Sequence, residues 1–234
     1  MRQRQVHRQK LQERGMEIWP DDQKIEAIDE HIQQTLFADD ADYHDELVAR
    51  TLELEAAKWG DDRAESRTVG GRKIHHLDKW DCAPAQLVLD RACEMFKRVV
   101  GSDTAHVDNS WANVYRAGDY IMPHSHRTSL ASMVYFLEPG EADADDPLAG
   151  QFCFVDPRIK LCCGHKDGYV TTPAFVDTVP GLMMIFPAQI VHFVTPYTGT
   201  KPRITIAMNL SRFAGEIEAD VGRADHAADP LARD

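Results

Sequence analysis

Residues 179–210 read VPGLMMIFPAQIVHFVTPYTGTKPRITIAMNL and contain three short apolar runs that are separated by proline and glycine. Four similar runs lie upstream, after Gly101: VDNSWANVYR, ASMVYFLE, QFCFVD and AFVDTVP. Short apolar or alternating runs with Gly, Pro and Asp clusters between them are typical of an antiparallel sandwich or barrel. We therefore expect residues 105–213 to form a jelly roll, that is, a double-stranded β-helix.

The first half of the chain has a different, helical period. Apolar residues recur at three- and four-residue steps in residues 21–36, and further helices are expected over residues 43–59 and 84–100. The predicted fold is α+β and mainly β, with a helical region at residues 21–104 that packs on one sheet of the barrel. The basic residues 1–20 and the acidic residues 214–234 are expected to be flexible tails.

Composition narrows the range of partners. The 234 residues carry a formal net charge of -12, which disfavours non-specific binding to nucleic acid or to an anionic membrane. A small basic substrate, or one bound without charge steering, suits such a chain better.

No apolar run reaches the roughly 18 residues of a membrane span. The basic N-terminus lacks the apolar core of a secretory signal, and the five cysteines lack CxxC spacing. We therefore predict a cytoplasmic protein.

Three histidines are candidate metal ligands. His124 and His126 are two residues apart, so on an extended strand both imidazoles point to the same face. His192 follows far downstream on another apolar run. Neutral imidazoles that project from rigid strands into a barrel mouth can hold one metal ion and leave positions open for other ligands. Histidines with a purely structural role are the alternative.

An arginine accompanies these histidines. In RITIAMNL, alternation places Arg203, Thr205, Ala207 and Asn209 on one face of a strand. A guanidinium on an inward face is costly without an anion, and its planar fork matches a carboxylate in two hydrogen bonds. An outward-facing arginine in a surface salt bridge is the alternative.

The order of these motifs resembles a known family. YRAGDYIMPHSH (residues 115–126), SMVYFL (132–137), VDPR (155–158) and the opening stretch (179–209) look like the 2-oxoglutarate- and iron(II)-dependent oxygenase superfamily. The closest likeness is to its uncharacterised bacterial and phage branch, and it covers about residues 105–212. It implies Fe(II) as cofactor, 2-oxoglutarate as cosubstrate, and O2.

The resemblance also implies roles for single residues. His124 and His192 would bind iron, and Arg203 would hold the distal carboxylate of 2-oxoglutarate with help from Thr205. The supporting residues of the cosubstrate pocket would be Asn113, Tyr115, Tyr135 and Asn209. The implied reaction hydroxylates an unactivated C–H bond of a small molecule or an amino acid or peptide, with release of succinate and CO2. A homodimer is possible.

The chain departs from the family pattern at His126. Most of the superfamily has a carboxylate two residues after the first histidine. If His126 is a ligand, the site is a neutral three-histidine triad. Otherwise Asp119 or water completes the shell. We favour His126 as the third ligand.

Two other functions remain open at this point. Gly118, Gly181, Pro187 and His192 partly keep the spacing of the two cupin motifs, although the cupin glutamate is missing. A metal-dependent cupin dioxygenase or isomerase would not use 2-oxoglutarate. A non-catalytic jelly-roll binding module would need neither metal nor cosubstrate.

Overall fold

The computed structural model describes residues 2–38, 41–59, 71–166 and 170–217. Its helices are α1 (Arg2–Glu13), α2 (Ala41–Trp59) and α3 (Ala83–Val100). Its strands are β1 (Glu26–Ala27), β2 (Gln33–Leu36), β3 (Arg72–His75), β4 (His106–Tyr115), β5 (Ile121–His124), β6 (Ala131–Glu138), β7 (Phe152–Phe154), β8 (Ala174–Val176), β9 (Leu182–Pro187), β10 (His192–Val194) and β11 (Arg203–Ser211).

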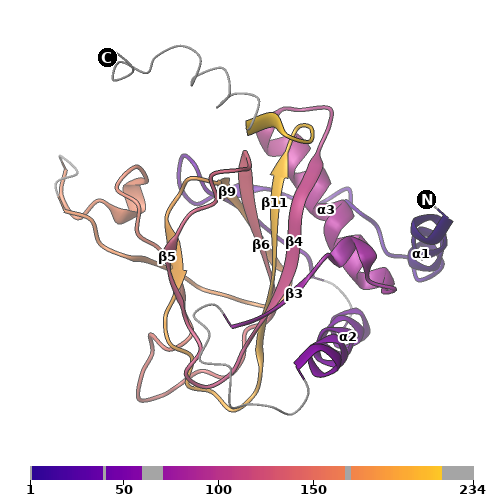
Figure 1. Ribbon diagram of the computed structural model, residues 1–234. Coiled ribbons are helices and arrows are strands. Elements are labelled where there is room, and N and C mark those ends of the chain that lie inside the picture. Colours follow the sequence, from indigo (N-terminus) through magenta and orange to yellow (C-terminus); the bar gives the residue numbers. More distant parts are fainter. Residues whose placement is uncertain (1, 39–40, 60–70, 167–169, 218–234) are drawn as a thin grey trace, which may run out of the picture.

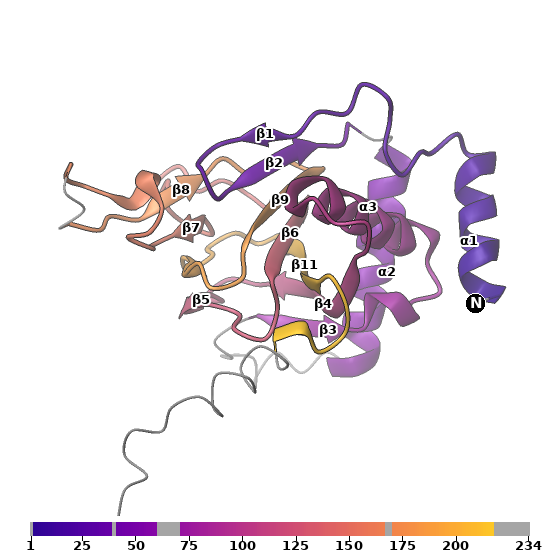
Figure 2. The same cartoon turned by 90° about the horizontal axis from the view of Figure 1, so that it is seen from above.

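The strands form two antiparallel sheets. The large sheet has the order β1-β2-β9-β6-β11-β4-β3, and the small sheet has the order β5-β10-β7-β8. The sheets face each other, and the helices lie on the outer side of the large sheet (Figures 1 and 2). This arrangement confirms the predicted jelly roll with helices packed on one sheet.

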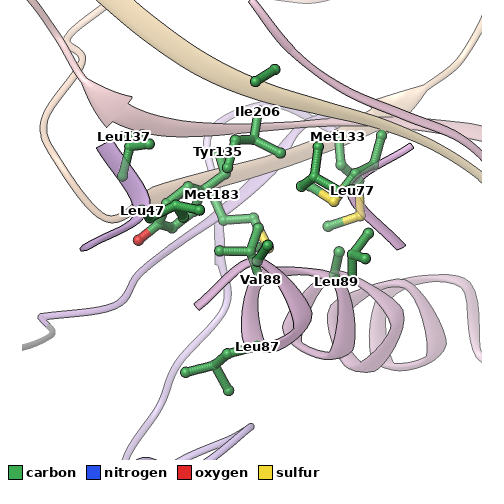
Figure 3. Close-up of a cluster of buried hydrophobic side chains, with 14 of the residues drawn as sticks. Leu47, Leu77, Leu87, Val88, Leu89, Met133, Tyr135, Leu137, Met183 and Ile206 are labelled. Carbon is green, nitrogen blue, oxygen red and sulfur yellow. The ribbon is translucent and has the colours of Figure 1, made fainter. Parts of the chain in front are cut away.

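Strand β11 shows why the large sheet has two different faces. Ile204, Ile206 and Met208 belong to the apolar core that the sheet shares with α2 and α3. This core is drawn in Figure 3, where Ile206 and Met133 lie above Leu89 of α3. The residues between them in β11 face the small sheet, as the alternation of RITIAMNL predicts. The large sheet is therefore apolar toward the helices and polar at the centre of its other face.

The helices α2 and α3 confirm two predictions from the sequence. The observed α2 begins two residues before the predicted start, and α3 begins one residue before it. Helix α3 has Pro84 in its first turn and ends at Gly101, whose φ of 68° is the left-handed conformation that glycine adopts easily.

The predicted helix at residues 21–36 is wrong. This segment contains β1 and β2, joined by a turn in which the Ile32 N–H donates to the Asp29 carbonyl. Residues 33–36 pair with residues 182–185 of β9, and Thr35 donates its hydroxyl hydrogen to the Lys24 carbonyl. Pairing with a strand distant in sequence outweighs the local helical period.

The predicted flexible tail at residues 1–20 also differs from the structure, because residues 2–13 form α1. Leu11 and His7 of this helix are 3% and 4% exposed. Arg8 donates two hydrogen bonds of 2.9 Å to the Asp90 carboxylate on α3. The apolar positions of an otherwise polar helix thus pack on α3, and the basic residues meet acidic partners there.

The predicted acidic tail at residues 214–234 lies mostly outside the described residues. Its described part includes Glu216, which is 3% exposed and accepts a 2.6 Å hydrogen bond from the Arg212 N–H. The chain is therefore still packed at this point. In the described part of the chain, no helix combines the length and the apolar character that a membrane span requires.

Candidate metal centre and cosubstrate pocket

The structure brings His124, His126 and His192 together. His124 of β5 and His192 of β10 are directly opposite in the antiparallel pairing, and His126 follows two residues after the end of β5. One ring nitrogen from each of the three lies within 4.8 Å of the other two. Such an arrangement can hold a single metal ion.

Backbone carbonyls orient two of these rings. Nδ1 of His124 lies 2.8 Å from the Met122 carbonyl, and Nδ1 of His192 lies 3.0 Å from the Ile190 carbonyl. Since a carbonyl only accepts, both Nδ1 atoms carry the hydrogen, which leaves the Nε2 lone pairs for a metal. This is the usual second contact of a metal-binding histidine.

Burial keeps the three imidazoles neutral. It lowers the pKa of His126 to about 4 and that of His192 to about 3, and it also lowers the pKa of His124. The mutual repulsion of protonated rings adds to the effect at His126 and His192. Neutral imidazole is the form that binds metals, so the site is ready for a cation at pH 7.

His126 is held separately from the other two. The backbone N–H of His126 donates a 2.7 Å hydrogen bond to the Ala188 carbonyl. The centroid of its ring lies 5.7 Å from that of the Trp111 ring. Asp119, the alternative ligand, accepts a 2.7 Å hydrogen bond from the Arg116 N–H instead. It is not part of the group of described residues that could hold a metal ion.

Arg203 is a buried cation, and no described residue pairs its charge with an anion. It is 1% exposed, and none of its three side-chain nitrogens makes a hydrogen bond of normal geometry to a described residue. The Tyr115 ring lies 5.0 Å from its guanidinium carbon. Burial lowers the pKa of Arg203 from its ordinary value. The surface salt bridge considered above is therefore excluded, and a carboxylate is the natural partner.

A row of polar side chains lies on the same face of the large sheet. Trp111 Nε1 donates to Asn113 Oδ1 at 3.0 Å, and Asn113 Nδ2 donates to Thr205 Oγ1 at 3.3 Å. Ser132 donates to Asn209 Oδ1 at 2.9 Å. Together with Tyr115, whose pKa burial raises to about 12, these residues border the cavity that also contains the histidines.

The cavity is narrow, with a volume of about 30 Å³. That space is enough for about two water molecules. Its walls include apolar residues from both sheets, among them Phe152, Phe186 and Val194.

The prediction for Tyr135 is wrong. This residue lies on the helix-facing side of β6, where its hydroxyl and His44 Nε2 are 2.7 Å apart. Figure 3 shows it beside Leu47 and Met183 in the apolar core under the helices. Its neighbour Val134 lines the cavity instead. Tyr135 is therefore part of the core and not of the cosubstrate pocket.

The sequence reading missed Lys73, which also lines the cavity. Residues 21–104 were expected to be a helical region, but within them β3 pairs with β4 so that Lys73 is opposite Asn113. The segment RKIH has a single apolar residue, Ile74, so it gives no clear local signal of a strand.

The DPR motif has a positioning role. Asp156 accepts a 2.8 Å hydrogen bond from Arg158 Nε and a 3.0 Å bond from the Val191 N–H, next to His192. The ion pair lowers the pKa of Asp156 to about 2. A permanent carboxylate thus fixes the backbone at the start of β10.

Comparisons with known proteins agree with this geometry. Residues 109–209 match the family described as "Putative 2OG-Fe(II) oxygenase". No curated protein matches the sequence.

Among solved structures, three similar folds are those of AviO1 from Streptomyces viridochromogenes Tue57, a Pseudomonas putida prolyl-4-hydroxylase, and HygX from Streptomyces hygroscopicus with nickel and 2-oxoglutarate bound. AviO1 is 15% identical with a TM-score of 0.58, covering 79% of this chain and 91% of AviO1. The prolyl-4-hydroxylase is 18% identical with a TM-score of 0.55 and coverages of 79% and 95%. HygX is 11% identical with a TM-score of 0.57 and coverages of 79% and 83%.

At these identities the likeness establishes the fold alone. Residues 109–209, which carry the three histidines and Arg203, are thus similar to the 2-oxoglutarate- and iron(II)-dependent oxygenases.

Proposed function

We propose that this protein is a 2-oxoglutarate- and iron(II)-dependent oxygenase that hydroxylates a C–H bond of a small molecule or of an amino acid or peptide. The observation that carries the proposal is the pairing of two features in one jelly roll. A cluster of three neutral histidines lies between the sheets, and Arg203 is a buried guanidinium without a hydrogen-bonding partner among the described residues. The first feature suits a metal, and the second suits a dicarboxylate cosubstrate.

In this proposal, His124, His126 and His192 bind iron(II). Their neutral state and the two carbonyl contacts to Nδ1 fit a divalent cation. Bound iron supplies the place where 2-oxoglutarate and O2 react, so that succinate and CO2 leave and the substrate is oxidised. The protein contributes ligand geometry and the exclusion of water, to which Phe152 and Phe186 add apolar walls.

Arg203 binds the distal carboxylate of 2-oxoglutarate in the same proposal. Thr205 lies two residues further on the same face of β11 and offers a hydroxyl donor. Tyr115 is the residue opposite Arg203 on β4, and its hydroxyl stays protonated because burial raises its pKa to about 12. It can therefore donate a hydrogen bond to the same carboxylate. Asn113 and Asn209 extend this polar face.

The buried arginine favours an oxygenase over a cupin enzyme. A cupin dioxygenase or isomerase needs the metal, but most cupins have no role for a guanidinium at this position. A non-catalytic module explains neither feature. A substrate that is a small molecule or peptide agrees with the prolyl-4-hydroxylase among the similar structures. A homodimer and a cytoplasmic location remain predictions.

Absorption spectroscopy tests the proposal. Iron(II) and 2-oxoglutarate added together without oxygen should give a visible charge-transfer band, and neither alone should give it. No band at saturating cosubstrate would contradict the oxygenase function. Iron binding without a band would favour a cupin enzyme, and no iron binding would favour the non-catalytic module. Succinate release screened against amino acids, peptides and small metabolites then identifies the substrate.

A further inference from the structure

Lys73 lies on the edge strand of the large sheet and points into the cavity. β3 is the last strand in the sheet order, and its residues Lys73 and His75 are opposite Asn113 and Trp111 of β4. Directly opposite residues in an antiparallel pair share a face. Lys73 therefore joins Trp111 and Asn113 on the face that carries the metal centre, and it does so at the mouth of the barrel.

The ammonium group of Lys73 has no carboxylate partner among the described residues. The side chain is half-buried, and Nζ lies 5.4 Å from the centroid of the Trp111 ring. Burial lowers the pKa of Lys73. A half-buried cation is costly, and Trp111 offsets part of that cost by a cation–π contact.

The charge around the metal centre is opposite to that of the whole chain. The protein has a formal net charge of -12, yet the described residues that line the cavity include Lys73 and neither Asp nor Glu. A second hollow that also includes His126 is lined by Arg127 and Arg158, again without an acidic residue among its described lining residues. Arg158 is neutralised by Asp156, and Arg127 is exposed. Local charge therefore favours an anion at the mouth.

Trp111 gives this mouth a rigid apolar wall. It is 7% exposed, its Nε1 is held by Asn113, and its ring lies next to that of His126. The carbon skeleton of a ligand held by Lys73 would lie against the Trp111 ring, beside the proposed iron ligand His126. Indole rings are well suited to such contacts because they are large and have few rotatable bonds.

Lys73 and Arg203 lie on two strands that flank β4 on opposite sides. Arg203 is opposite Tyr115 on one side of β4, whereas Lys73 is opposite Asn113 on the other side. Arg203 is fully buried and Lys73 is partly open to solvent. Arg203, which is enclosed, and Lys73, which is at the mouth, are therefore suited to bind two different anions.

We propose that Lys73 anchors the substrate by binding an anionic head group, a carboxylate in the first instance, with the substrate's carbon skeleton against Trp111. This inference rests on the proposed function, because it assigns the substrate side of the same site. It replaces the expectation of a basic or uncharged substrate that the net charge alone suggests.

The test uses the full chain loaded with zinc(II) and 2-oxoglutarate, because zinc is diamagnetic and has no redox chemistry. The Trp111 indole N–H signal, assigned with Trp111→Phe, is followed by NMR during titration with phenylacetate, phenylacetamide or phenylphosphonate. Phenylacetate should shift the Trp111 signal until the site is saturated. Half-saturation should require a roughly tenfold higher concentration of phenylacetamide than of phenylacetate. If phenylphosphonate binds more tightly than phenylacetate, the anion that Lys73 binds is a phosphate-type head group.

Variants separate the role of Lys73 from general effects. Lys73→Met should remove the preference for phenylacetate, Lys73→Arg should keep it, and the exposed Lys24→Met should behave like the native protein. The other indole signals report whether each variant is folded. Equal binding of phenylacetate and phenylacetamide, no binding of either, or an unchanged preference in Lys73→Met would each overturn the proposal.

Two cosubstrate outcomes keep this proposal distinct from the oxygenase function. If Lys73→Met weakens 2-oxoglutarate binding as strongly as it weakens phenylacetate binding, Lys73 serves the cosubstrate and the inference is wrong. If 2-oxoglutarate does not bind the native zinc-loaded protein, the oxygenase proposal fails. The titrations are then repeated with zinc alone, where a Lys73-dependent preference for phenylacetate would still establish an anion site.

Discussion

His124 and His192 are paired across β5 and β10, with their ring centroids 4.4 Å apart. Each Nδ1 donates to the carbonyl two residues earlier in its own chain segment. The strand register thus fixes two of the three candidate ligands. His126 lies beyond the end of β5, and a backbone bond to Ala188 and contact with Trp111 hold it instead. Its role as a ligand is therefore the one that most needs an experiment.

Changing His126 tests the three-histidine site. His126→Ala should lower iron(II) affinity by about tenfold or more, because even outer partners of metal ligands have effects of that size. His126→Asp should retain iron, since a carboxylate is the usual residue at this position in the superfamily. Isothermal titration without oxygen measures both. The exposed His31→Ala is the control, and an iron affinity in His126→Ala equal to that of the control would remove His126 from the site.

Replacement of Arg203 should separate cosubstrate binding from iron binding. Arg203→Met should abolish the rise in melting temperature that 2-oxoglutarate causes, while iron(II) still binds. Because the guanidinium is buried without a hydrogen-bonding partner in the described part of the chain, Arg203→Met should leave the ligand-free protein equally stable or more stable.

Thermal unfolding with and without 2-oxoglutarate measures both effects of Arg203→Met. The surface variant Arg98→Met should keep the full response to 2-oxoglutarate. Loss of iron binding together with the 2-oxoglutarate response would mean that Arg203 has a structural role.

The same substitution, Tyr to Phe, can be compared at Tyr135 and at Tyr115. Tyr135→Phe should lower the free energy of unfolding by about 1 kcal/mol, because its hydroxyl bonds His44 under the helices, and should leave 2-oxoglutarate affinity unchanged. Tyr115→Phe should weaken 2-oxoglutarate binding, because Tyr115 lies beside Arg203. Urea unfolding and calorimetric titration of both variants compare them. The reverse pattern would show that Tyr135 and not Tyr115 serves the pocket.

The sequence predicted the centre of this site better than its rim. Alternation in β11 correctly assigned Arg203 and Thr205 to the inner face, since one side of that strand is apolar and the other polar. The same reasoning does not work for Tyr135, because β6 is buried on both faces and its pattern does not reveal which residues point inward. The pairing with β11, seen in the Ser132–Asn209 bond, shows the orientation of β6.

The short strands at or next to the two edges of the large sheet were the hardest part to predict. β2 and β3 have four residues each, and each depends on pairing with a strand far away in sequence. Local patterns carry little information about such pairing. This explains both the wrong helix at residues 21–36 and the failure to identify Lys73.

Buried neutral histidines should make the metal-free protein sensitive to acid. Burial lowers the pKa of His192 to about 3, whereas in the unfolded chain the ordinary value near 6.5 applies. Below about pH 6.5 the unfolded chain takes up a proton that the folded protein does not, so stability is full above this pH and falls as the pH decreases toward 3. Urea midpoints between pH 7 and 5 should fall less in His192→Asn. An equal fall would mean that other groups are responsible.

Helix α1 provides a test of the N-terminal region that the sequence suggested was a flexible tail. Leu11 is 3% exposed in the core shared with α3, whereas Val6 of the same helix is 51% exposed. Leu11→Ala should therefore lower the free energy of unfolding by about 2 kcal/mol or more, because it leaves a cavity in packed apolar surroundings. Val6→Ala, the control, should change it by less than about 0.5 kcal/mol. Urea unfolding monitored by circular dichroism measures both variants. If Leu11→Ala were as mild as Val6→Ala, α1 would contribute no stability and the contacts of Arg8 with Asp90 would be incidental.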